Sequence, residues 1–273
     1  MIAAALSHAA RNTMNVPNIM PDPSNMMPRT ALITGAGRRI GRAITLALSR
    51  AGYAVVLNSH ASRAEAEKLA ADIIDVGGRA AVVLADLADH DAVRGLIAAA
   101  GAFGPLTLLV NNASEFESDE IGNLERARFE RTMAVNLTAP LFLAQAFAAQ
   151  APAGASIVNI VDQRVLKPTP LFFSYALSKA ALHDATTMLA QALAPKLRVN
   201  AVAPGPTLPS PRQSEEQFAA QAKTMPLGHG PSPDDIAAAV LYLAEAKSVT
   251  GVTIAVDGGQ HLAWRTPDSD MPE

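Results

Sequence analysis

The feature that most constrains the fold of this chain is a regular alternation, from residue 29 onward, between apolar runs of strand length and longer helical stretches. Continuous apolar runs are typical of strands buried on both faces, since helices then cover both sides of the sheet. The alternation predicts a single-domain α/β fold: a doubly wound, seven-stranded parallel sheet with right-handed crossovers and helices on both faces. We expect the strands at 30–35, 54–59, 80–86, 106–113, 156–162, 197–205 and 252–259.

The helical stretches between these strands cover 39–51, 62–76, 89–100, 124–150, 174–194 and 232–246. The last one begins with helix-start signals, because Ser232 suits an N-cap, Pro233 suits the first helical position, and two acids follow. Segment 206–231 interrupts the alternation, since it is rich in Pro and Gly and holds one short helical stretch, 214–223. Ligands of open α/β sheets bind beyond the carboxyl ends of the strands, so we expect 206–231 to form a substrate lid.

The composition of the 273 residues excludes several classes of protein. The chain has no cysteine, which excludes disulfides and a thiolate zinc site, and we predict no metal site. A formal net charge of −3, with acids and bases interspersed, argues against nucleic acid or an anionic membrane as a partner. We find no apolar run long enough to cross a bilayer, and we expect a protein of the reducing cytoplasm.

The two ends of the chain stand apart from the alternating region. Residues 1–28 are rich in methionine and proline without lasting periodicity, so we expect a flexible arm, or an upstream start with Met26 or Met27 as the true first residue. The polar stretch 265–273 is typical of a disordered tail. The predicted folded domain therefore covers 29–264.

The stretch "TGAGRRIG" (34–41) follows the first predicted strand and opens the first helix. Small residues there let the backbone approach a pyrophosphate, whose charge a helix N-terminus favours; an ordinary Gly-rich turn is the alternative. Arg38 and Arg39 offer planar forks to a phosphate, or form a solvated charge pair. The second strand is followed by His60, Ser62 and Arg63 instead of the Asp or Glu that holds a ribose 2′-hydroxyl. Together these residues favour NADPH over NADH, although His60 alone is equally typical of a surface histidine.

A second motif, "YALSK", places Tyr175 and Lys179 four residues apart and therefore on one face of a predicted helix. A tyrosine titrates near pH ~10, and a nearby ammonium favours the phenolate. We therefore expect Tyr175 to be a usable proton donor or acceptor near neutrality. The spacing alone is a weak signal, because many helices carry Tyr and Lys without a catalytic role.

Taken together, the motifs resemble those of the short-chain dehydrogenases/reductases over about residues 29–262. In chain order they read "TGAGRRIG", "ADL" (85–87), "NNA" (111–113), "VN" (135–136), "YALSK" (175–179), "RVNAVAPG" (198–205) and "VDGG" (256–259). The resemblance implies a Rossmann fold, bound NADPH or NADP+, and a homodimer or homotetramer. The coenzyme contacts that we expect come from Gly35, Arg38, Arg39, Ile40, Gly41, His60, Ser62, Asp86, Leu87, Asn112, Ala113, Ser114, Tyr175, Lys179, Pro204, Gly205 and Thr207.

The resemblance also assigns places within that set. Asp86 and Leu87 would line the adenine pocket, Asn112 and Ala113 would pass beside the nicotinamide ribose, and Lys179 would bind that ribose. Pro204 and Gly205 would border the nicotinamide ring. Asn136 would help to organise a proton relay to the catalytic residues.

The chain departs from the common pattern of that family at two places. Arg39 replaces the middle glycine of the turn, and Asp162 replaces the serine that usually lies thirteen residues before the tyrosine. A serine hydroxyl donates to a substrate carbonyl, which an ionised Asp cannot do. Both departures resemble the pteridine-reductase branch, which carries an Asp-Tyr-Lys set and reads N-N-A-S-x-F, as residues 111–116 do.

The resemblance to that branch implies that Phe116 stacks on a pterin, opposite the nicotinamide, because a flat heteroaromatic ring gains from a parallel aromatic face. The pterin or the coenzyme phosphates would also be contacted by Arg39, Ser114 and Thr207. Asp162 would either orient Tyr175 or, if burial keeps it protonated, donate to a ring nitrogen or amino group. A wall aromatic at position 116 and a strand-end acid bonded to backbone amides at position 162 are the structural alternatives.

The leading hypothesis is an NADPH-dependent reductase of a dihydropterin or similar C=N substrate, with Asp162, Tyr175, Lys179 and Asn136 in catalytic roles. A carbonyl or 3-oxoacyl reductase of the same family is the alternative, and an NADPH-binding regulator without turnover is a third reading. The apolar helices 124–150 and 174–194 are candidates for a symmetric interface. Trp264 would join an interface or cap the core.

Overall fold

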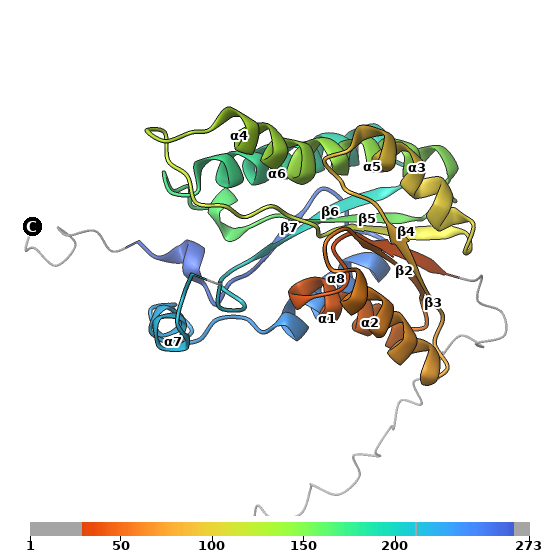
Figure 1. Cartoon of the computed structure of the whole chain (residues 1–273), viewed down its shortest axis with the longest axis horizontal. Coiled ribbons are helices and arrows are strands. Elements are labelled where there is room, and N and C mark those ends of the chain that lie inside the picture. Colours follow the sequence, from red (N-terminus) through yellow and green to blue (C-terminus); the bar gives the residue numbers. More distant parts are fainter. Residues whose placement is uncertain (1–28, 211, 265–273) are drawn as a thin grey trace, which may run out of the picture.

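The computed structural model describes residues 29–210 and 212–264, and these form one seven-stranded sheet in which all strands are parallel, as predicted (Figure 1). The strand order is β3-β2-β1-β4-β5-β6-β7. The strands are β1 (Thr30–Ile33), β2 (Ala54–Ser59), β3 (Ala80–Leu84), β4 (Leu106–Asn111), β5 (Ser156–Ile160), β6 (Arg198–Pro204) and β7 (Thr253–Val256). The predicted arm over 1–28, with Met26 and Met27, and the predicted tail over 265–273 lie outside the described residues.

Helices cover both faces of this sheet, which confirms the doubly wound Rossmann arrangement (Figure 1). One face carries α1 (Arg39–Arg50), α2 (Arg63–Asp75) and α8 (Pro233–Glu245). The other face carries α3 (His90–Gly101), α4 (Arg126–Met133), α5 (Ala139–Gln150) and α6 (Phe173–Leu193). The short helix α7 (Glu215–Lys223) lies apart from both layers, between β6 and α8.

Two apolar cores, one on each face of the sheet, explain why the strands are apolar throughout. In β1, Ile33 packs into the core under α1, α2 and α8, while its neighbour Leu32 packs into the core under α3, α5 and α6. Successive strand residues point to opposite faces, and here both faces are dry. The continuous apolar pattern is therefore a direct consequence of the two helical layers.

The long predicted helix over 124–150 is observed, but it begins at Arg126 and contains a π-helical turn, Ala134–Thr138, between α4 and α5. By length and composition alone, Arg126–Gln150 could cross a membrane, which the sequence-based prediction missed. In the structure 44% of its apolar window is buried, and it packs against α3 and α6. Its apolar character thus serves the core of the α/β domain.

Several strands end earlier than predicted, and the difference places the functional loops. The residues at 34–35, 85–86, 112–113 and 161–162 belong to loops rather than to strands. In a parallel sheet these strand ends share one edge, and β1 has β2 on one side and β4 on the other. The connections from β1 and β4 therefore diverge there and leave a crevice, which is where ligands of such sheets bind.

Both predicted helix starts in the C-terminal third are observed. Ser232 caps α8, since its Oγ accepts a hydrogen bond from the Asp235 amide while the Asp235 carboxylate accepts from the Ser232 amide. Ser214 and Gln217 form the same reciprocal arrangement at α7. Each capping box satisfies backbone donors at a helix N-terminus. Trp264 is 72% exposed in this structure.

Adjacent isoleucines on α2 provide a matched test of the packing. Ile73 is 1% exposed within the core under α1 and α2, whereas Ile74 is 52% exposed. We predict that Ile73→Ala lowers the free energy of unfolding by about 2–5 kcal/mol, since it leaves a cavity. Ile74→Ala changes the same residue type in the same helix and should cost no more than about 0.5 kcal/mol. Urea titrations followed by circular dichroism measure both, and equal losses would contradict the assigned core.

Candidate active site

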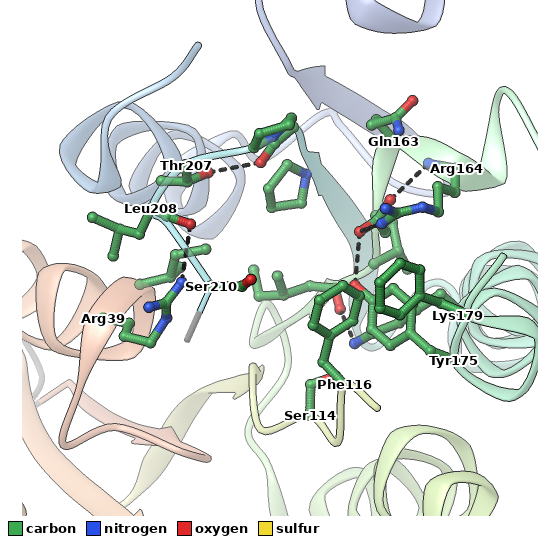
Figure 2. Close-up of a pocket in the computed structure, with 18 of the residues that line it drawn as sticks. Arg39, Ser114, Phe116, Gln163, Arg164, Tyr175, Lys179, Thr207, Leu208 and Ser210 are labelled. Carbon is green, nitrogen blue, oxygen red and sulfur yellow. Dashed lines mark hydrogen bonds and ion pairs between the residues drawn. The ribbon is translucent and has the colours of Figure 1, made fainter. Parts of the chain in front are cut away.

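A cavity of about 510 Å³ lies at the carboxyl edge of the sheet, beyond β1, β4, β5 and β6 (Figure 2). Eleven predicted site residues line it: Arg39, Ile40, Asn112, Ser114, Phe116, Asp162, Tyr175, Lys179, Pro204, Gly205 and Thr207. The remaining predicted residues lie outside the lining: Gly35, Arg38, Gly41, His60, Ser62, Asp86, Leu87, Ala113 and Asn136. Segment 206–231 contributes further wall residues, including Leu208, Ser210, Phe218 and Gln221.

The turn between β1 and α1 is packed too tightly for side chains at two glycines. Gly35 has a φ of +62°, and a Cβ there would lie 2.9 Å from the Ala113 Cα. A Cβ at Gly41 would lie 2.1 Å from the Gly35 carbonyl oxygen. The Asn112 side chain fastens the turn from the other side, since it donates to the carbonyls of Thr34 at 2.9 Å and Gly35 at 3.1 Å. The "NNA" motif therefore holds the turn in shape.

Arg39 has a glycine-like backbone, because its φ of 51° lies in the left-handed region. This is the position at which the family pattern has glycine. Its guanidinium donates to the carbonyl of Leu208 at 3.2 Å, beside which it lies in Figure 2, and to the carbonyl of Pro209 at 3.0 Å. Strained residues of this kind persist where the surroundings hold them, often at functional sites. Arg39 thus connects the turn to the segment expected to form the lid.

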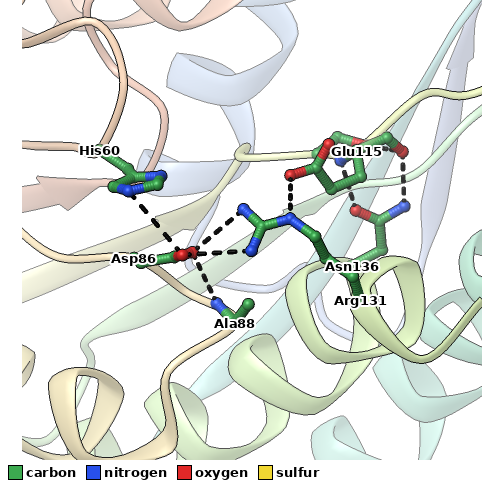
Figure 3. A network of polar contacts seen from close by, with 7 residues as sticks. His60, Asp86, Ala88, Glu115, Arg131 and Asn136 are labelled. Atoms are coloured by element: carbon green, nitrogen blue, oxygen red, sulfur yellow. Dashed lines mark hydrogen bonds and ion pairs between the residues drawn. The ribbon is translucent and has the colours of Figure 1, made fainter. Parts of the chain in front are cut away.

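A polar network surrounds the residues expected at the adenine end (Figure 3). Arg131 on α4 pairs with both oxygens of Asp86, at 3.1 and 3.3 Å, and with Glu115 at 3.1 Å. Burial acts to raise the pKa of Asp86, but the Ala88 amide and Arg131 outweigh it and keep the pKa below its usual value. His60 lies 3.8 Å from Asp86 and is largely exposed. The sequence reasoning missed Arg131, because its partners lie 45 and 16 residues away.

Asn136 connects this network to the helix that carries the tyrosine. It lies in the π-helical turn, and its amide exchanges hydrogen bonds with the backbone N–H and carbonyl of Glu115, at 2.8 and 3.0 Å. It also donates to Ser178 Oγ at 3.0 Å, and that hydroxyl donates to the Tyr175 carbonyl at 2.7 Å. In this structure Asn136 therefore holds the loop after β4 against α6.

The predicted acid, tyrosine and lysine meet at the base of the cavity. The Tyr175 hydroxyl donates to Asp162 Oδ2 at 2.7 Å, and Lys179 Nζ donates to the Ile160 carbonyl at 2.7 Å. Tyr175 and Lys179 are both buried. The spacing of 13 residues works because Asp162 follows β5 while Tyr175 lies in the first turn of α6, which packs beside it.

The lowered pKa expected for Tyr175 is not found. Burial and the Asp162 carboxylate raise the pKa of Tyr175 well above its usual range. Lys179 Nζ lies 5.8 Å from the centre of the Tyr175 ring and is engaged by a backbone carbonyl. The loss of water and the adjacent carboxylate outweigh the Arg164 guanidinium, which acts to lower this pKa. Tyr175 therefore carries its proton at neutral pH.

Aromatic rings form one wall of the cavity. Phe116 stacks on Phe172 with ring centres 4.6 Å apart and planes 9° apart, and it meets the edge of Tyr175 at 4.7 Å. Phe172 precedes α6 in the left-handed region, with a φ of 55°. The sequence reasoning missed Phe172, although its position three residues before Tyr175 offered a signal. One face of Phe116 is thus already covered by protein.

Two arginines that the sequence reasoning also missed flank these rings. The Arg164 guanidinium lies 5.7 and 5.4 Å from the centres of Phe116 and Phe172, and that of Arg212 lies 5.5 and 5.8 Å from them. Arg164 pairs with Asp162 at 3.1 Å, and Arg212 pairs with Glu117 at 3.2 Å. Arg164 was identifiable from its place two residues after Asp162, whereas Arg212 comes from the distant segment 206–231.

The burial of Lys179 predicts a pH dependence of stability. Burial lowers the pKa of Lys179 to about 8, although Asp162 acts in the opposite direction. Between pH 8 and the pKa of the unfolded chain, ~10.4, the unfolded state binds the extra proton, so the contribution of Lys179 to stability rises with pH. We predict that wild type gains on the order of 3 kcal/mol relative to Lys179→Met across this range. Denaturant titrations at several pH values test this, and a constant difference would contradict it.

Comparison with known proteins places this fold and site in a family. A family model described as enoyl-(acyl carrier protein) reductase matches residues 35–261. An uncharacterised oxidoreductase of Methylorubrum extorquens is 37% identical over 247 residues, which cover 86% of this chain and 99% of that protein.

Two solved structures are more similar in sequence. FolM alternative dihydrofolate reductase 1 of Brucella canis, in complex with NADP, is 49% identical with a TM-score of 0.85, over 88% of this chain and 96% of that one. The Brucella suis protein of the same name, also with NADP, is 49% identical with a TM-score of 0.85, over 89% and 98%. This chain therefore belongs to the short-chain dehydrogenase/reductase family of NAD(P)-dependent oxidoreductases.

Proposed function

We propose that this protein is an NADPH-dependent reductase of a dihydropteridine or a similar C=N heterocycle. The observation that carries the proposal is the hydrogen bond from the Tyr175 hydroxyl to Asp162, beside the Phe116 ring in the same cavity. A carboxylate accepts hydrogen bonds and suits the N–H groups of a nitrogen heterocycle better than a carbonyl oxygen. The FolM dihydrofolate reductases at 49% identity support this substrate class.

The turn before α1 fits the coenzyme. Its glycines leave no space for side chains, so the backbone is accessible to a diphosphate. The first turn of α1 reads Arg-Ile-Gly-Arg, and the preceding residue is Arg38, so basic side chains add to the positive end of the helix. NADP is named for the two FolM structures. With His60 and Ser62 after β2, these features support NADP(H), and we propose that Arg38, Arg39, His60 and Ser62 meet its phosphates.

The chain's own residues account for the proton side of the reaction. NADPH, when bound, supplies the hydride that reduces the substrate carbon. Tyr175 donates its hydroxyl proton to the adjacent ring nitrogen, so one C–H and one N–H bond form as the tyrosine O–H bond breaks. Asp162 orients that hydroxyl, and Lys179 holds the ribose beside it. A solvent proton then restores Tyr175.

The aromatic wall and its neighbours support a flat substrate. Phe116 lines the cavity, and its ring would offer a flat surface to a bicyclic substrate. Asp162 would meet the polar edge of that ring, with Ser114, Thr207 and Arg39 at its periphery. A carbonyl or 3-oxoacyl reductase is the second candidate, supported by a putative ketoacyl reductase of Streptomyces violaceoruber that is 34% identical over 242 residues.

We also propose that the protein is a cytoplasmic homodimer or homotetramer. Apolar side chains are exposed on the outer surfaces of α5 and α6, among them Phe142, Leu177 and Met188. Exposed apolar groups on adjacent helices are typical of subunit interfaces. Light scattering measures the assembly directly.

The decisive test is turnover of a defined substrate. We predict that the purified protein oxidises NADPH with dihydrobiopterin, dihydromonapterin or dihydrofolate. Tyr175→Phe should lower kcat by about 100-fold or more, because the proton donor is lost, while NADPH fluorescence still reports binding. Wild-type protein that binds NADPH but reduces none of the three would refute the pterin assignment. Equal turnover by Tyr175→Phe would refute the role of the tyrosine.

Substitution of the acid separates the two candidate reactions. We predict that Asp162→Ser lowers kcat/KM for the dihydropterin by about 10-fold or more and raises activity toward ketones, since a hydroxyl donates to a carbonyl oxygen. Asp162→Asn provides the control, because it keeps the size of the side chain and removes the charge. A ketone activity that falls together with the pterin activity in Asp162→Ser would argue against this division of roles.

A further inference from the structure

Arg164 makes two separate contacts with Asp162, although neither the family motifs nor the reaction outlined above uses it. Its backbone N–H donates to Asp162 Oδ1 at 2.8 Å, and its guanidinium Nη1 donates to Asp162 Oδ2 at 3.1 Å. The second oxygen is the one that also accepts the Tyr175 hydroxyl. One carboxylate thus connects an arginine to the proposed proton donor.

The local chain explains why these contacts form. Asp162 caps the 3-10 turn Gln163–Val165, so the carboxylate and the Arg164 amide are brought together within three residues. The guanidinium then lies beside the rings of Phe116, Phe172 and Tyr175, at 5.7, 5.4 and 6.0 Å from their centres. Its side chain is 23% exposed and that of Asp162 is 14% exposed, so water screens this ion pair only partly.

Proton donation by Tyr175 creates a charge problem at this point. Loss of its hydroxyl proton leaves a phenolate oxygen 2.7 Å from the Asp162 carboxylate. Two anions this close repel each other strongly in a buried site. The negative charge of Asp162 therefore makes it harder for Tyr175 to lose its proton. A cation in direct contact with the pair relieves that repulsion.

The other cationic groups near Tyr175 and Asp162 are less able to relieve the repulsion between the phenolate and the carboxylate. Lys179 on α6 donates to the Ile160 carbonyl, and its Nζ lies 5.8 Å from the Tyr175 ring centre. Arg212, from the segment after β6, pairs with Glu117 and donates to the Phe116 carbonyl at 2.8 Å. Arg39 on α1 donates hydrogen bonds to the backbone carbonyls of Leu208 and Pro209. Among the described residues, only Arg164 joins Asp162 in an ion pair.

We propose that Arg164 is a positioning residue whose guanidinium offsets the charge of Asp162, so that Tyr175, and not Asp162, delivers the proton. The inference rests on the proposed function for its chemical step. The Tyr175 O–H bond breaks, the substrate N–H bond forms, and the phenolate charge is stabilised by the Arg164–Asp162 pair until a solvent proton arrives. Asp162 transfers no proton in this step and acts through its hydrogen bond.

Kinetics of three variants test this role. Arg164→Gln should lower kcat on the order of 10- to 100-fold with KM for NADPH unchanged, because Tyr175 becomes a weaker acid. The solvent deuterium isotope effect on kcat should increase, since proton transfer becomes more rate-limiting. Arg164→Lys keeps the cation and should recover most of the rate. Arg212→Gln removes the other guanidinium beside the same rings, and whatever it does to KM, it should leave the isotope effect at the wild-type value.

A measurement without turnover keeps the inference separate from the proposed function. In protein labelled with carbon-13 at the tyrosine Cζ atoms, Tyr175→Phe identifies the Tyr175 signal. We expect that signal to begin to move toward the phenolate position at higher pH in Arg164→Gln than in wild type, because Arg164 acts to lower the pKa of Tyr175, and to be unchanged in Arg212→Gln. NADPH binding verifies that each variant is folded. If wild type reduces no dihydropterin, the proposed function fails and this titration still decides the role of Arg164.

Three results would overturn the inference. The first is a rise in KM alone, with kcat and its isotope effect unchanged, which would make Arg164 a binding residue. The second is an Arg164→Lys variant as slow as Arg164→Gln, which would show that charge is not the cause. The third is a Tyr175 signal that ionises identically in wild type and Arg164→Gln.

Discussion

The parallel direction of all seven strands is the constraint on which the rest of this structure depends. It brings every strand end that matters to one edge of the sheet, so the turn after β1, the loop after β4, Asp162 after β5 and Pro204 at the end of β6 border one cavity. The order β2-β1-β4 opens the crevice, because the chain leaves β1 and β4 in opposite directions. The two apolar cores on the faces of the sheet stabilise the fold, and the polar loops at its carboxyl edge form the site.

At that edge, the pKa values of Tyr175 and Lys179 depend on burial and on short contacts rather than on the net charge of the chain. The Tyr175 hydroxyl is held by a carboxylate that is itself held by Arg164; burial and the carboxylate raise the pKa of the tyrosine, and the arginine acts in the opposite direction. Lys179 is buried on the same helix, where a backbone carbonyl engages its ammonium. In such a site burial and a charge within hydrogen-bonding distance dominate the pKa of the tyrosine. The pKa of Tyr175 is therefore raised, whereas Tyr-x-x-x-Lys by itself suggests that it is lowered.

Two strained residues mark the borders of the cavity. Arg39 and Phe172 both adopt the left-handed backbone region, which side chains usually avoid. Each is held by contacts to distant segments, Arg39 by the carbonyls after β6 and Phe172 by the ring of Phe116. The surroundings therefore enforce both conformations, and both bring a functional side chain to the cavity wall.

The sequence by itself determined the fold class, the strand and helix order and the Ser232 N-cap, and its family resemblance indicated the meeting of Asp162, Tyr175 and Lys179. The features of the fold follow from local patterns and from the rule that parallel strand ends share an edge. Only the tertiary structure decided the stacking of Phe116 on Phe172, the contact of Arg39 with Leu208 and Pro209, and the network around Arg131. It also decided the direction in which the pKa of Tyr175 is shifted. These features depend on distances between segments far apart in the chain and on burial, and neither quantity is encoded in residue spacing.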